Sequence, residues 1–162
     1  MPENPDHPFA AHFDPDRYDL RRSEIAVVMG RFFLRYLSLV YRQFEGDFLL
    51  PIVLGEIAHH NVFHLFSPTG EKIETPQPLE RMKKFQPTNA FSISQATGIP
   101  RETVRRKIEK LAKKGWIVKN PRGEVFLSES VADHFAQDFN KDILAELLKA
   151  ADCIRNLLSH DS

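Results

Sequence analysis

The segment from Asn89 to Leu111 places the tightest constraint on how this chain can fold. Gly98 lies near its centre, and glycine readily adopts the positive φ that a tight turn between two helices requires. Pro100 suits the first turn of a following helix, because its missing N–H would be unpaired there in any case. Apolar residues at helical spacing lie on both sides of the turn: Ile93, Ala96, Ile99, Val104, Ile108 and Leu111. The segment therefore predicts a short helix capped near Asn89, a tight turn and a second helix, which is a helix-turn-helix.

A short β-hairpin is predicted directly after the second helix. Lys113-Lys114-Gly115 is typical of a helix end, where cations lie near the negative pole and glycine takes the position after the cap. Residues 116–119 and 124–127 form two short strand-like runs, and residues 120–123 between them have the composition of a turn. Helix, turn, helix and hairpin together predict a winged helix, in which the hairpin is the wing.

Basic residues are concentrated in this same region. Residues 101–122 contain nine basic and two acidic residues, a net charge of +7, whereas the whole chain is neutral and the remainder therefore carries −7. A basic surface on an otherwise acidic protein favours binding of nucleic acid, because salt screens the distant acidic residues from a bound phosphate. We expect the following residues to contact double-stranded DNA: Arg101, Glu102, Thr103, Arg105, Arg106, Lys110, Lys119 and Arg122.

Members of this set suit different parts of DNA. In the major groove an arginine can bond to O6 and N7 of guanine, and Glu102 can accept a hydrogen bond from N4 of cytosine. Thr103, Lys107 and Lys110 are expected nearer the phosphates, which position a protein without reading sequence. The two basic residues at the hairpin tip are expected along the backbone or the minor groove.

Ordinary helix surfaces carry similar charges, so an alternative stays open. Glu102 and Arg106 are four residues apart, as are Arg105 and Glu109, and such pairs stabilise the solvated face of a helix. Under this alternative, the winged helix contacts a protein or RNA and does not read a DNA sequence.

The run from Gly98 to Arg106, Gly-Ile-Pro-Arg-Glu-Thr-Val-Arg-Arg, resembles the recognition segment of Crp-type regulators, which often reads Gly-x-Ser-Arg-Glu-Thr-Val-x-Arg. By this resemblance Arg101, Glu102 and Arg106 occupy base-reading positions. Pro100 departs from the pattern, because a serine usually caps the helix there. No cyclic-nucleotide β-roll is expected before the motif, since the N-terminal part of the chain is predicted to be helical.

The predicted order of elements is more similar to that of MarR-type regulators. In that family, N- and C-terminal helices flank a central winged helix and interlock with those of a second subunit. The resemblance implies a DNA-binding transcriptional regulator that acts as a homodimer. The flanking segments also carry more apolar residues than a small winged helix can cover. The alternative is a monomer in which these flanking helices pack on each other.

The expected fold class is mainly α with a small β-hairpin wing, a winged helix-turn-helix flanked by N- and C-terminal dimerisation helices. Ser23 is the expected cap of the first long helix, and a second helix is expected from about Asp47 to Leu65. The predicted organisation is a flexible N-terminal arm at 1–20, an N-terminal helical dimerisation region at 21–66, a Pro-rich connection at 67–88, the winged helix at 89–128 and a C-terminal dimerisation helix at 129–162.

Other candidate sites have weaker support. Glu56, His60 and His64 are spaced four residues apart, and such a helix face can supply metal ligands. No Cys or carboxylate cluster completes the set, so a surface or interface cluster is the better explanation and no metal is expected. A small-molecule effector bound near Glu56–His64 is a further candidate partner. Cys153 is expected to be a buried, inert thiol.

No sequence motif indicates catalysis. The chain has no Gly-rich phosphate loop, no nucleophile elbow and no acid–base pair at a telling spacing, so we expect neither enzymatic activity nor a cofactor. Its single cysteine excludes an internal disulfide, and its apolar runs are shorter than the ~18 residues of a membrane span. The N-terminus lacks the features of a signal peptide, so a cytoplasmic location without membrane contact is expected.

Overall fold

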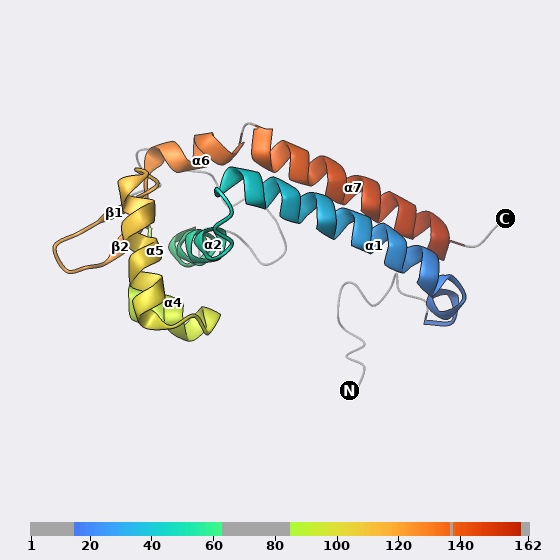
Figure 1. Ribbon diagram of the computed structural model, residues 1–162, viewed down its shortest axis with the longest axis horizontal. Helices are drawn as coiled ribbons and strands as arrows, with labels where there is room; N and C mark the ends of the chain where they lie inside the picture. Colours follow the sequence, from blue (N-terminus) through green and yellow to red (C-terminus); the bar gives the residue numbers. More distant parts are fainter. Residues whose placement is uncertain (1–14, 63–84, 137, 160–162) are drawn as a thin grey trace. The chain divides into compact units, whose positions relative to one another are not determined.

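The structure is a computed structural model that describes residues 15–62, 85–136 and 138–159 (Figure 1). It is mainly helical with one small antiparallel hairpin, as the sequence predicts. The elements in order are α1 (Pro15–Gln43), α2 (Leu49–Val62), α4 (Ala90–Thr97), α5 (Arg101–Lys113), β1 (Ile117–Lys119), β2 (Val125–Leu127), α6 (Glu129–Ala136) and α7 (Asp138–Leu158). None of the described helices has an apolar stretch long enough to cross a membrane.

The chain divides into two compact units. The central unit comprises Val40–Phe139, and the terminal unit comprises Met1–Leu39 together with Asn140–Ser162. The segment with the helix-turn-helix pattern lies wholly in the central unit. The two units are described separately below.

The core of the central unit is built from one apolar face of each short element. Val104, Ile108 and Leu111 of α5 are buried, because residues three and four apart share one side of a helix. The other buried residues of this core include Leu50, Val53, Leu54 and Ile57 of α2, Ile93 of α4, Ile117 of β1, Val125 of β2 and Val131 of α6. The apolar pattern that includes Ile93 and Ala96 predicts both side chains to face inward, which is wrong for Ala96: it is exposed, because α4 meets the core through the side that carries Ile93.

The turn between α4 and α5 has the predicted local chemistry. Asn89 caps α4, and its Oδ1 accepts hydrogen bonds from the backbone N–H groups of Phe91 at 2.9 Å and Ser92 at 3.1 Å. Gly98 follows α4 with a φ of 70°, a conformation that costs glycine little. Ile99 is then buried between the helices, which fixes where α5 begins.

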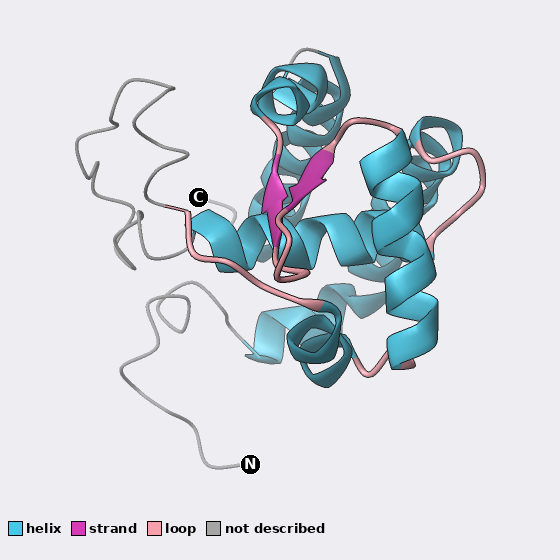
Figure 2. Cartoon of the chain, turned by 90° about the vertical axis from the view of Figure 1, so that its left-hand side faces the viewer, coloured by secondary structure: helices cyan, strands magenta, loops and turns pink. Residues whose placement is uncertain are grey.

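The hairpin pairs β1 with β2 in antiparallel register, with Ile117 opposite Leu127 (Figure 2). Its turn is held by Asn120, whose Oδ1 accepts from the N–H groups of Arg122 and Glu124, both at 3.0 Å. This arrangement satisfies the backbone at the tip and leaves the Arg122 side chain exposed.

Asn61 at the end of α2 joins three parts of the central unit. Its side chain is fully buried. The Nδ2 group donates to the carbonyls of Gln86 at 2.7 Å and Val125 at 3.4 Å, and Oδ1 accepts from the N–H of Leu127 at 2.8 Å. Asn61 thereby ties β2 and the segment before α4 to α2.

Some element boundaries differ from the sequence prediction. The first helix begins at Pro15 and not at Ser23, because proline is tolerated in a first turn and Asp16 there favours the helix dipole. The predicted arm at 1–20 is therefore helical from residue 15, while residues 1–14 lie outside the described residues. α2 is described to Val62, and most of the predicted connection at 67–88 also lies outside the described residues. The predicted C-terminal helix is two helices, α6 and α7.

The terminal unit pairs α1 with α7 in antiparallel orientation. Arg35 Nη1 contacts Glu146 Oε1 at 2.8 Å. Arg17, near the start of α1, donates to the carbonyl of Ser159, which follows the end of α7. Ile25 is buried, whereas no residue described in α7 is buried. Cys153 on α7 is exposed, so the prediction of a buried thiol is wrong for this chain taken alone. Two helices bury too little surface to cover the apolar face of α7.

Replacing Asn61 tests its role in holding the hairpin. We expect Asn61→Ala to lower the free energy of unfolding by about 3 kcal/mol, because buried polar groups lose their partners at roughly 1–3 kcal/mol each. Urea unfolding followed by the fluorescence of Trp116, the only tryptophan of the chain, reports on the central unit. The exposed Asn156→Ala is the control and should change little. A loss below about 0.5 kcal/mol for Asn61→Ala would contradict this role.

Candidate nucleic-acid interface

The outward face of α5 is polar and lies opposite its buried stripe. At about 100° per residue, Glu102, Arg106 and Lys113 lie on the side opposite Val104 and Ile108. All three are exposed. Burial of one side of α5 thus presents these side chains to solvent. Lys113 lies within the basic segment at 101–122 but was not among the predicted DNA contacts. Its position opposite the buried residues of α5 is the signal that could have identified it as one.

Arg105 is held on the helix surface by two carboxylates. Its Nη2 contacts Glu102 Oε1 at 2.7 Å and its Nε contacts Glu102 Oε2 at 2.9 Å, while Nη1 donates to Glu109. The hydrogen bond from Arg105 lowers the pKa of Glu102, and the same contact raises the pKa of Arg105. Of the two charge pairs expected on a solvated helix surface, the pair between Arg105 and Glu109 is present. Glu102 pairs with Arg105 and not, as expected, with Arg106.

Arg106 and Arg101 form no ion pair with a carboxylate of the described residues, although the charge of Arg106 helps to lower the pKa of Glu102. Arg106 forms no ion pair or hydrogen bond with any residue that the structure describes. Arg101, at the start of α5, lies over the ring of Phe91 with its Cζ 6.0 Å from the ring centre. A guanidinium over an aromatic ring still presents its edge to a ligand. Among the arginines of α5, these two are thus the ones that can bond to an external acceptor.

The remaining predicted contacts divide between solvent and the protein itself. Lys119 and Arg122 are exposed at and beside the hairpin turn, and Thr103 is half-buried on α5. Lys110 and its neighbour Lys107 lie on the flank of α5 that faces the loop after α1. Most of the predicted DNA contacts therefore lie on α5 and the adjacent hairpin. Lys107 and Lys110, in contrast, point toward the loop after α1.

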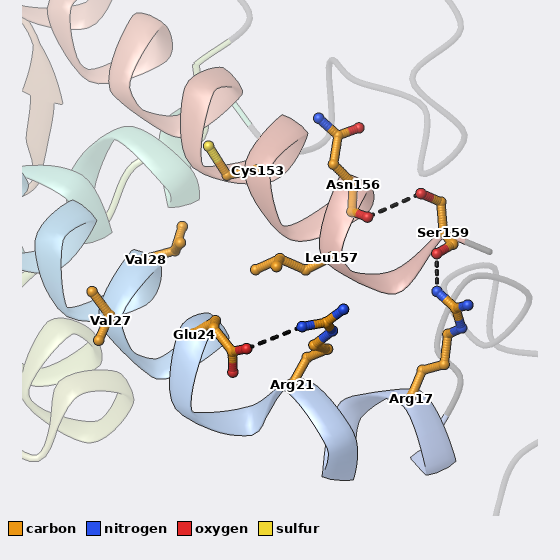
Figure 3. A pocket seen from close by; sticks show the side chains of 9 residues that line it. All are labelled: Arg17, Arg21, Glu24, Val27, Val28, Cys153, Asn156, Leu157 and Ser159. Atoms are coloured by element: carbon orange, nitrogen blue, oxygen red, sulfur yellow. Dashed lines mark hydrogen bonds and ion pairs between the residues drawn. The ribbon is translucent and has the colours of Figure 1, made fainter. Parts of the chain in front are cut away.

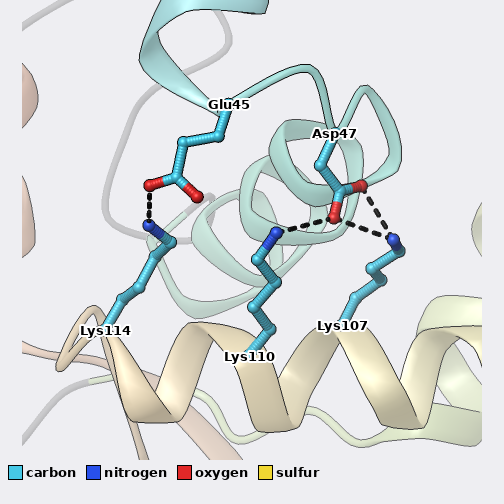
Figure 4. A network of polar contacts seen from close by, with 5 residues as sticks. All are labelled: Glu45, Asp47, Lys107, Lys110 and Lys114. Atoms are coloured by element: carbon cyan, nitrogen blue, oxygen red, sulfur yellow. Dashed lines mark hydrogen bonds and ion pairs between the residues drawn. The ribbon is translucent and has the colours of Figure 1, made fainter.

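Asp47 forms ion pairs with both Lys107 and Lys110 (Figure 4). Lys107 Nζ contacts its two carboxylate oxygens at 2.7 and 2.9 Å, and Lys110 Nζ contacts Oδ2 at 3.2 Å. One turn further along α5, Lys114 Nζ contacts Glu45 Oε1 at 2.7 Å. Burial acts to raise the pKa of Asp47, but the hydrogen bonds and charges of the two lysines outweigh it, and the pKa is lowered. Asp47 and Glu45 were not anticipated, because no local pattern connects them to α5.

Comparison with known proteins adds no relative. No protein-family model, no curated protein and no solved structure matches this chain. The likeness to Crp-type and MarR-type regulators therefore rests on the residues and the order of elements given above, and the site is interpreted from its geometry.

The structure describes two of the three predicted metal candidates. Glu56 is half-buried and His60 is exposed on α2, while His64 lies outside the described residues. Among the residues described, no group of three His, Cys, Asp or Glu side chains could hold a metal ion. The candidate effector site at Glu56–His64 likewise extends beyond the described residues.

A cavity lies elsewhere, between α1 and α7 of the terminal unit (Figure 3). Its volume is about 690 Å³. Val28 and Leu157 give it an apolar wall, and Arg21, paired with Glu24 at 3.3 Å, gives it a charged rim. Cys153 also lines it. None of the residues that line this cavity belongs to the range 56–64, where an effector was expected.

The ion pairs of Asp47 predict a specific dependence of stability on pH. The lowered pKa means that the carboxylate stabilises the fold at pH values above about its ordinary 3.8, and that this contribution is lost as the pH falls through the folded-state pKa. We expect Asp47→Asn to be less stable than the native chain by about 1–2 kcal/mol at pH 7, and by almost nothing at the lowest pH.

Urea unfolding of both proteins between pH 7 and about pH 2.5 measures this difference. Asp152→Asn is the control, because its pair with Arg155 is exposed on both sides and should contribute little at any pH. A constant difference across the whole pH range would contradict a role for the Asp47 charge.

Proposed function

We propose that this chain is a DNA-binding transcriptional regulator that acts as a homodimer. In this proposal α4, α5 and the β1–β2 hairpin form a winged helix, with α5 in the major groove and the hairpin on the adjacent backbone or minor groove. The observation that carries the proposal is the exposed guanidinium of Arg106, which has no ion-pair or hydrogen-bond partner in the described part of the chain, on a short helix that follows a tight turn.

In this proposal, different cations contact the bases and the phosphates, depending on whether they are paired within the protein. Arg106 is suited to bidentate bonds with O6 and N7 of guanine, and Arg101 lies at the N-terminal end of α5, where helices of this kind meet base edges. Arg105 keeps its two carboxylate partners and orients the exposed Glu102. Lys119, Arg122 and Lys113 are exposed cations suited to phosphates. The site has no role for a metal or cofactor in this proposal.

Replacing Arg106 tests sequence reading directly. Duplexes enriched from a random pool by the native protein supply a binding site, and a scrambled duplex supplies the control. We expect Arg106→Ala to weaken binding to the enriched duplex by about 10- to 100-fold and to the scrambled duplex much less, because a bidentate contact contributes roughly 1–3 kcal/mol of discrimination.

Fluorescence anisotropy over a salt series measures both affinities. Lys141→Ala on α7 is the control, since this exposed cation lies outside the central unit. If the native protein enriches no sequence and binds every duplex equally, the proposal fails and the alternative partner, protein or RNA, is favoured.

The proposed homodimer is supported by the terminal unit. Between Ser23 and Leu39 the only charged residues of α1 are Glu24, Arg31 and Arg35, and all three lie on the side that faces α7. The other side is uncharged and apolar. The large apolar side chains of this unit that are exposed are Tyr18, Leu20, Val27, Met29, Phe33, Leu34, Tyr36, Leu37, Leu144, Leu147 and Leu148.

This exposed surface has the size and composition of an interface. A standard protein interface buries roughly 800 Å² on each partner, and these exposed large side chains, apart from Val27, which lines the cavity beside α7, offer surface of that order. A second copy presents the same uncharged face, so a two-fold pair buries both without leaving a charge unpaired. We therefore assign α1 and α7 as the dimerisation helices.

A charge on this face is expected to separate the subunits. Leu147→Glu places a carboxylate on the apolar side of α7, and we expect it to raise the dimer dissociation constant by at least about 100-fold. Sedimentation equilibrium measures the constant. Ala145→Glu is the matched control, because this exposed residue lies on the polar side of the same helix. Equal dissociation of both variants, or a native chain that is monomeric at micromolar concentration, would contradict the assignment.

A further inference from the structure

The loop between α1 and α2 has a backbone that serves to place two carboxylates. Glu45 has a φ of 54° and is the one non-glycine residue with positive φ in the described chain; Gly46 follows with a φ of 79°. A Cβ on Gly46 would lie 3.1 Å from the ring of Tyr41, a tight contact, and its positive φ also favours glycine. Positive φ at a non-glycine residue is costly and is kept where the surroundings require it. We call residues 45–47 the acidic corner.

The acidic corner covers a stripe of lysines on α5. Lys107, Lys110 and Lys114 are spaced by three and four residues and therefore lie along one flank of the helix. Figure 4 shows all three pointing toward Glu45 and Asp47. The Asp47 side chain is 15% exposed and that of Lys107 is 21% exposed, so this pair is largely withdrawn from solvent.

A buried hydrophobic contact would hold α5 in place equally well. Ion pairs withdrawn from water are only weakly stabilising, since loss of hydration offsets much of the attraction. The core already fixes α5 through three fully or nearly fully buried side chains. Stability alone therefore does not account for three lysines paired with two carboxylates. The ammonium groups of these lysines are also suited to bind phosphate. A carboxylate and a phosphate both offer anionic oxygens to an ammonium group.

We propose that the acidic corner occupies a phosphate-binding stripe on α5 and keeps these lysines from the DNA backbone. This inference rests on the proposed DNA-binding role of α5. Phosphate contacts supply most of the sequence-independent affinity of a DNA-binding protein. Masking the lysines lowers that affinity and leaves the guanidinium groups of Arg101 and Arg106 untouched. The acidic corner therefore raises the ratio of specific to non-specific binding.

The salt dependence of DNA binding tests the masking. The variant is Glu45→Gln with Asp47→Asn, and the ligand is a 20-base-pair duplex of mixed sequence, measured by fluorescence anisotropy from 50 to 300 mM KCl. Each phosphate neutralised adds about 0.9 to the slope of log K against log salt. We expect the variant to have a slope steeper by about 2–3 and to bind the duplex at least about tenfold more tightly at the lowest salt.

Two further variants separate masking from other causes. Glu129→Gln with Asp138→Asn changes the net charge by the same amount at exposed positions of the central unit, and it should leave the slope near that of the native protein. Adding Lys107→Gln, Lys110→Gln and Lys114→Gln to the corner variant should return the slope to its native value. Thermal unfolding by circular dichroism confirms that each variant is folded at the temperature of the binding measurement.

The outcomes distinguish this inference from the proposed function. A steeper slope in the corner variant supports masking, even if the native protein enriches no sequence from a random pool and the proposed function fails. An unchanged or shallower slope in a folded variant overturns masking and makes the acidic corner a structural tether, even if the native protein selects a site. An equally steep slope in the exposed-charge control also overturns it, as does a corner variant that binds no duplex.

Discussion

Burial of Val104, Ile108 and Leu111 against α2 and α4 determines which side of α5 faces solvent. A helix of 13 residues has little stability by itself, so packing of this stripe also decides that the helix forms at all. The arrangement of side chains at the candidate interface depends on this orientation. It places Arg106 outward and turns the lysine flank toward the acidic corner, whereas Arg105 meets its carboxylate partners through the spacing within α5 itself.

The same orientation reduces the number of cations that are accessible to a ligand at residues 101–122. The basic window holds nine cations, but Arg105, Lys107, Lys110 and Lys114 are each paired with a carboxylate. Five remain for an external ligand: Arg101, Arg106, Lys113, Lys119 and Arg122. Net charge counted along a sequence therefore overstates the field that a ligand meets. The proposed function assigns the binding of phosphates and the reading of guanine to this smaller set.

Features determined by neighbouring residues were predictable. The positive φ of Gly98, the cap at Asn89 and the turn at residues 120–123 each depend on a few consecutive positions, and the structure has them where the sequence predicts them. Long-range pairs were not predictable. Asp47 and Lys107 are 60 residues apart, and no periodicity connects them. The exposed Cys153 was missed for a related reason: an apolar helix predicts burial, but not whether its own chain supplies the cover.

The link from Asn61 to the hairpin also bears on the order in which the central unit assembles. Asn61 and Leu127 are 66 residues apart, so their hydrogen bond forms only after a large loop has closed. A ladder of three residue pairs has too few contacts to persist alone in water. The hairpin can therefore become stable only when the end of α2 is already in place. The hairpin thus shares its stability with distant parts of the central unit, through the Asn61 amide, the backbone bridge between Thr88 and Val125 and the burial of Ile117 and Val125.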